Sequence, residues 1–119
     1  NMFGVLEFYF TAIKKFKGAV KPLLGCQIYV DAQSSGQSDP YHHDRLVLIA
    51  SNQEGYQSLT KIVTYGHLDG FDQKPLVTLD VLRANSKGLI VLYGGIDSLY
   101  AKHILHDKKQ NADHGKAKF

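Results

Sequence analysis

The chain of 119 residues has no tryptophan, one methionine and one cysteine, Cys26. A single cysteine excludes an internal disulfide, and we expect a reducing, cytoplasmic setting. No apolar run approaches the roughly 20 residues that a membrane helix needs, so no membrane partner is predicted. Asn1 stands where an initiator methionine is expected, and no signal peptide precedes the first helical pattern. We therefore expect a piece of a longer protein.

Composition is that of one globular domain, with 44% hydrophobic and 21% charged residues. The net charge of +3 is concentrated toward the end of the chain. Residues 107–119, which form that end, are mostly polar or charged. No aromatic side chains alternate with the basic ones there, as base stacking would require. We predict a solvated or frayed tail instead of a nucleic-acid site.

The most informative stretch begins with the apolar run 46–50, which is typical of a strand buried on both faces. Ser51 stands three residues before Glu54, which predicts a capping box at the start of a helix. Apolar residues then recur at helical spacing until Gly66 and Gly70. A buried strand that leads into an amphipathic helix predicts an α/β domain with a largely parallel sheet.

A helix is predicted over residues 2–17, with Gly18 as its C-terminal stop. Its apolar face is wide and aromatic, which favours packing in the core over a cofactor site. The residues of this face are Phe3, Val5, Leu6, Phe8, Tyr9, Phe10, Ala12, Ile13 and Phe16.

Residues 23–30 are predicted to form a strand, in which Gly25 marks a bulge or a close backbone approach. Gln27 lies in the middle of this apolar strand, either as a hydrogen-bonded glutamine or as a site residue at the edge of a sheet. The other predicted elements are a loop over 31–44, a loop over 72–76, a helix over 79–84 capped by Thr78, a strand over 89–93 and a helix from Asp97.

Two histidine groups could suggest a metal site. His42 and His43 are adjacent and followed by Asp44, but neighbouring residues of an extended chain point to opposite sides. His103 and His106 have no acidic residue at a known ligand spacing. Neither group predicts a metal site.

Gly94 and Gly95 stand between a predicted strand and the helix that begins at Asp97. This order suits phosphate binding at a helix N-terminus, and an unrelated phosphate-binding α/β module is one hypothesis for the chain. The lysine of a P-loop is absent, and Asp97 adds negative charge, so a tight turn is the better interpretation. The residues alone therefore predict no catalytic and no cofactor-binding residue.

The motifs taken together nevertheless resemble one family. In chain order they are the opening Asn1, G-V-L-E-F-Y, K-P-L-L-G, L-I-A-x-N-x-x-G-Y-x-x-L, G-F-x-x-K-P and G-L-I-V-L. This set, which covers about residues 1–100, resembles the N-terminal PHP (polymerase and histidinol phosphatase) domain of bacterial DNA polymerase III alpha subunits.

The resemblance implies a fold of the α/β class, part of a distorted (β/α)7 barrel with mostly parallel strands and flanking helices. Residues 1–119 would then be a partial PHP domain. The H-x-H and T-D-H-G motifs that precede this region in the family are absent, and so are the closing strands. Strand edges left unpaired in this way predict self-association or missing segments.

Three metal-ligand positions of the family fall within the chain, and each carries a different residue type. Gln27 replaces a glutamate, Arg45 replaces a histidine and Gly95 replaces a cysteine. A shift of the alignment by two residues would bring His43 to one of these positions. We therefore predict a degenerate site with no metal ligand, because an amide binds metal weakly and a guanidinium repels it.

The resemblance implies a segment of the DNA replication polymerase that acts as a scaffold and as a docking site for the proofreading exonuclease subunit. The parent chain would be a DNA-directed DNA polymerase, while this segment would have no activity of its own. The expected partners are the remaining domains of the alpha subunit, the exonuclease subunit and, through the parent protein, DNA. The alternative is an active PHP phosphoesterase that uses zinc or manganese; magnesium would act only in the polymerase domain.

Overall fold

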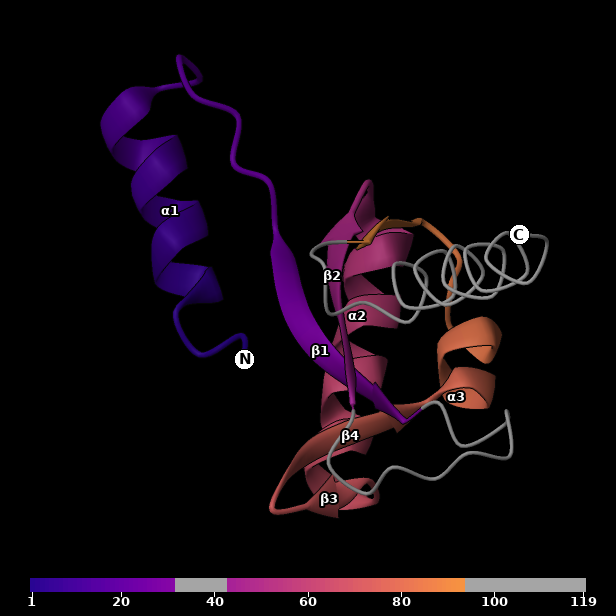
Figure 1. Ribbon diagram of the computed structural model, residues 1–119. Coiled ribbons are helices and arrows are strands. Elements are labelled where there is room, and N and C mark those ends of the chain that lie inside the picture. The colour runs from indigo at the N-terminus through magenta and orange to yellow at the C-terminus, as the bar shows by residue number, and fades with distance from the viewer. Residues whose placement is uncertain (32–42, 94–119) are drawn as a thin grey trace, which may run out of the picture.

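A computed structural model describes residues 1–31 and 43–93 (Figure 1). The predictions for the turn at Gly94 and Gly95, for the helix from Asp97 and for the tail lie outside this part, as do those for His42, His103 and His106. The described elements are α1 (Val5–Phe16), β1 (Gly25–Asp31), β2 (Asp44–Ala50), α2 (Gln53–Leu68), β3 (Phe71–Asp72), β4 (Lys74–Thr78), α3 (Leu79–Ala84) and β5 (Leu89–Tyr93).

The strands form one open sheet in the order β3-β4-β1-β2-β5. The pairs β1–β2, β2–β5 and β3–β4 are antiparallel, and only β1 and β4 are parallel neighbours. The prediction of mostly parallel strands is therefore wrong. The class is mixed α/β, and closure into a (β/α)7 barrel stays a prediction.

The reason for the single parallel pair lies after α2. Strand β3 runs in the same direction as β2, as a crossover helix would require, but it is only two residues long. The chain then reverses at Gln73, whose φ of 57° is in the left-handed region. The longer strand β4 consequently runs opposite to β2 and pairs with the far side of β1.

The hydrophobic core lies on one face of this sheet. Alternate residues of β1 and β2 point toward α2, whose Leu59 and Ile62 are fully buried against Leu48. Leu82 of α3 joins the same cluster, so both helices cover the same face. Burial of each large aliphatic side chain contributes about 1.5–3 kcal/mol, which makes this layer the main source of stability.

The opposite face of the sheet is open in the described part of the chain. Val47 of β2 is 37% exposed, while Ile90 and Leu92 of β5 are 49% and 46% exposed. The prediction that residues 46–50 are buried on both faces is therefore wrong. The apolar run was correctly assigned to a strand, but within residues 1–31 and 43–93 a helical layer covers only one of its faces.

The ribbon of helix α1 stands apart from the sheet (Figure 1), and its Leu6 and Phe10 line a cavity together with Ile90 of β5. It ends at Phe16, followed by Lys17 and Gly18 with φ of 42° and 85°, close to the predicted stop. The prediction that its aromatic face packs in the core is wrong. The extended segment before β1 leads the helix away from the sheet. Only Ala12 of the helix is buried.

Candidate functional site: the open face of the sheet

The two described positions of the predicted degenerate metal site lie on the open face. Tyr29 pairs with Arg45 across the antiparallel β1–β2 ladder, and Gln27 pairs with Val47. Since side chains alternate along a strand, Gln27, Tyr29, Arg45 and Val47 all point to the same side. Both Gln27 and Arg45 are exposed there. The fold thus brings together two positions that are 18 residues apart in the sequence.

This donor set does not fit a metal ion. Gln27 offers a neutral amide oxygen, and the permanent positive charge of Arg45 opposes a cation nearby. Among residues 1–31 and 43–93, no group of three or more His, Cys, Asp or Glu side chains is placed to hold a metal. The third position, Gly95, lies outside the described residues, so the absence of a metal stays a prediction.

His43 lies two residues before Arg45, and its side chain is half-buried. The Nδ1 atom of its ring is buried without a hydrogen-bond partner. An unsatisfied buried ring nitrogen is unusual, because such groups normally find a partner. His43 therefore places an imidazole nitrogen of a type suited to a metal near the open face.

Sequence reasoning missed a contact at the β4 side of this face. The ammonium of Lys74 lies 4.5 Å from the centre of the Tyr29 ring, within range of a cation–π interaction. Lys74 comes 45 residues after Tyr29, so only the parallel pairing of β1 and β4 reveals the contact. The open face thus carries two cationic side chains, Arg45 and Lys74, around Tyr29.

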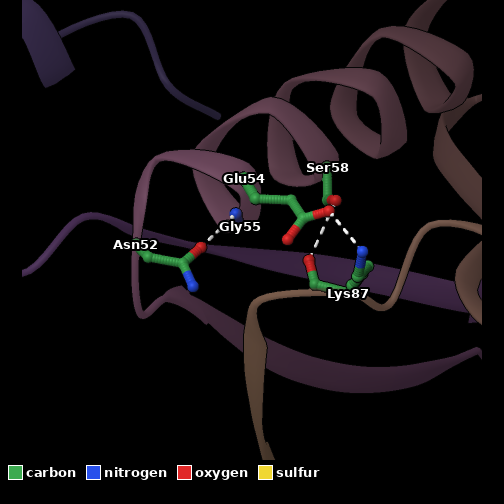
Figure 2. Close-up of polar contacts among 5 residues, drawn as sticks. All are labelled: Asn52, Glu54, Gly55, Ser58 and Lys87. Atoms are coloured by element: carbon green, nitrogen blue, oxygen red, sulfur yellow. Dashed lines mark hydrogen bonds and ion pairs between the residues drawn. The ribbon is translucent and has the colours of Figure 1, made fainter.

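A second polar cluster joins the start of α2 to the turn before β5 (Figure 2). The helix is capped by Asn52, whose Oδ1 accepts a hydrogen bond of 2.8 Å from the Gly55 N–H. The predicted capping box is therefore wrong by one residue. Ser51 instead donates from Oγ and from its N–H to the Gly88 carbonyl, and Glu54 forms an ion pair of 2.9 Å with Lys87.

The hydrogen bonds of this cluster hold the helix against the turn. Ser58 Oγ donates a hydrogen bond of 3.0 Å to the Lys87 carbonyl (Figure 2). The backbone of Gly55 lies directly against the Gly88 carbonyl, so a Cβ atom at position 55 would collide with it. Because its polar groups are used within the fold, the cluster is structural and is not a binding site.

Within residues 1–31 and 43–93, no helix combines the length and the apolar character needed to cross a membrane.

Comparison with known proteins identifies this mixed α/β unit. The family model described as PHP domain matches residues 1–118, and the chain belongs to the PHP domain family. Its relatives include the DNA polymerase III subunit alpha of Thermus aquaticus, 34% identical over 120 residues that cover 95% of this chain and 9% of that protein. The subunit alpha of Helicobacter pylori strain J99 is 33% identical over 118 residues, covering 97% of this chain and 9% of that protein.

The subunit alpha of Chlamydia trachomatis is 31% identical over 115 residues, which cover 92% of this chain. The chain spans about 9% of the length of each of these three relatives. The resemblance inferred from the motifs is thus confirmed for the family and for homology to DNA polymerase III alpha subunits.

The contact between Gly55 and Gly88 predicts a large effect of Gly55→Ala. The added methyl group must displace the backbone of the turn, which we expect to lower the free energy of unfolding by roughly 1–3 kcal/mol or more. The matched control is Gly66→Ala on the same helix, where the new Cβ would meet its nearest neighbours at an ordinary 3.4 Å. Urea denaturation should show destabilisation only for Gly55→Ala; equal stability of both variants would contradict the contact.

The ion pair between Lys87 and Glu54 predicts a pH-dependent contribution to stability. A hydrogen bond from Lys87 to Glu54 and the negative charge of Glu54 raise the pKa of Lys87 above its ordinary 10.5. Its contribution is therefore complete below 10.5 and is lost as the pH rises through the higher pKa of the folded state. The stability difference between wild type and Lys87→Gln should shrink in this range. The control is Lys61→Gln, at an exposed position. If its stability difference from wild type shrank as much over the same pH range, the ion pair with Glu54 would not be the cause.

Proposed function

We propose that the chain is a segment of the PHP domain of a DNA polymerase III alpha subunit and acts in DNA replication as a scaffold. The observation that carries this proposal is the relationship over 95% of the chain to a protein named DNA polymerase III subunit alpha. The parent chain would then be a DNA-directed DNA polymerase of the cytoplasm that contacts DNA through other domains. This segment would supply structure and no catalytic residue.

The open face supports a degenerate site. Gln27 and Arg45 stand together where the family resemblance implies a glutamate and a histidine, and neither residue suits metal-activated water. A domain that keeps the fold of the family but lacks its metal ligands is consistent with a supporting role. In this proposal the segment binds no zinc, manganese or other cofactor.

The apolar side chains on the open face support contact with further polypeptide. Val47, Ile90 and Leu92 expose apolar area on the face that no described helix covers, where a further layer of polypeptide would pack. The remaining domains of the alpha subunit are the first expected partner. Docking of the proofreading exonuclease subunit is the second, and it rests on the family resemblance alone.

An active metal-dependent phosphoesterase is the alternative function. The unpartnered Nδ1 of His43 favours it, because this nitrogen could bind a metal if flanking segments supplied further ligands. The charge of Arg45, two residues away, opposes it.

Elemental analysis of the longer protein that contains this chain tests the proposal. Purified without chelator, it should contain close to no zinc, manganese or iron outside the polymerase site. A double substitution, Gln27→Glu with Arg45→His, returns two positions to the ligand types of the family and should increase the bound metal. The opposite result would be two or three metal ions per unmodified chain that are lost on His43→Ala. It would overturn the scaffold proposal and favour the active phosphoesterase.

A further inference from the structure

Helix α1 has an apolar surface that the described part of the chain leaves uncovered. Six of its side chains and the preceding Phe3 are between 38% and 87% exposed. They are Phe3, Leu6, Phe8, Tyr9, Phe10, Ile13 and Phe16. A helix of 12 residues is marginally stable in water without packing, so this surface requires a partner.

Positive charge borders this apolar surface near the C-terminal end of the helix. Lys14 and Lys15 lie in the last turn and Lys17 follows it, whereas Glu7 is the single acidic residue of the helix. The ammonium of Lys14 lies 5.5 Å from the centre of the Phe10 ring, directly beside the apolar surface. A fitting partner therefore has exposed apolar side chains next to carboxylates.

The chain carries such a surface at the end of α2, which we call the acidic corner: Leu68, Asp69, Phe71 and Asp72. Leu68 is 75% exposed and Phe71 is 59% exposed. Asp69 and Asp72 are exposed as well, and no ion pair is recorded for either with another described residue. The nearby Lys74 is directed at the ring of Tyr29.

Within one chain the lysine-bearing end of α1 and the acidic corner are far apart. The lysine-bearing end of α1 is at the top of Figure 1, while β3 and the end of α2 are at the bottom. It is the opposite end of the helix that lies near α2, where the ring of Phe3 contacts that of His67 at 6.4 Å. The lysines of α1 therefore cannot meet the acidic corner of their own chain in this arrangement.

We propose that two copies of this chain associate, with α1 of each copy docked on the acidic corner of the other. Such a reciprocal exchange is an isologous interface, in which each contact occurs twice. The apolar area for this interface comes from Phe3, from the six exposed side chains of α1, and from Leu68 and Phe71. A stable interface needs only about 800 Å² from each partner.

Sedimentation of the 119-residue chain over a range of protein and salt concentrations tests the dimer. The unmodified chain should form a dimer that weakens as salt screens the lysine–carboxylate pairs. Lys14→Glu with Lys15→Glu should weaken self-association about tenfold or more, and so should Asp69→Lys with Asp72→Lys. An equimolar mixture of these two charge-reversed proteins should form a heterodimer, because both reciprocal contacts are then complementary: the acidic α1 meets the basic corner and the basic α1 meets the acidic corner.

Matched controls separate this contact from a general charge effect. Lys61→Glu changes the net charge as much as Lys15→Glu alone, at an exposed position of α2 away from both surfaces, and should leave the dimer unchanged. Far-ultraviolet circular dichroism confirms that each variant is folded. A monomer at all concentrations, a dimer insensitive to the charge reversals, or no heterodimer in the mixture would each overturn the proposal.

Discussion

The described structure depends on the packing of α2 against one face of a four-stranded core of the sheet. Leu59 and Ile62 are fully buried between the helix and the strands. This contact requires the helix to start close to the turn before β5, where Gly55 allows two backbones to touch and Asn52 and Ser51 satisfy the polar groups. Since the same turn leads into β5, the helix and the outer strand are positioned together.

One-sided packing also explains the open face. Once α2 and α3 occupy one side of the sheet, alternate residues of β1 and β2 must point to the other. Gln27 and Arg45 are brought together by this alternation, and the apolar Val47, which lies opposite Gln27 on β2, remains partly exposed. The face is therefore both the place where the family resemblance implies metal chemistry and the place where further polypeptide would add a layer.

Local features of the fold were predictable from the sequence. The end of α1 near Gly18, the strand that contains Gly25 and the cap of α3 at Thr78 follow from residue preferences, and the Thr78 side chain accepts from the Val81 N–H. A Cβ at Gly25 would lie 2.7 Å from the Leu48 carbonyl oxygen, which confirms the predicted close approach. Each of these features depends on a few neighbouring residues.

Features that depend on distant contacts were not predictable in this way. The direction of β4 follows from the left-handed conformation of Gln73, which no residue preference indicates. Apolar spacing assigned α1 to a helix but could not show that the segment before β1 would lead it away from the core. The cap of α2 moved from Ser51 to Asn52 because Ser51 bonds Gly88, 37 residues later in the chain. Only the family resemblance connected Gln27 with Arg45 before the register was known.

Hydrogen–deuterium exchange of the 119-residue chain, at a dilution where it is monomeric, tests the central role of α2 most directly. The amides of β1, β2 and the second half of α2 should share the slowest exchange, because they open only with the whole core. The amides of α1 should exchange at least about a hundredfold faster, since that helix contributes little to the core. Equal protection of α1 and α2 in the monomer would contradict the account and would mean that α1 belongs to the same folding unit.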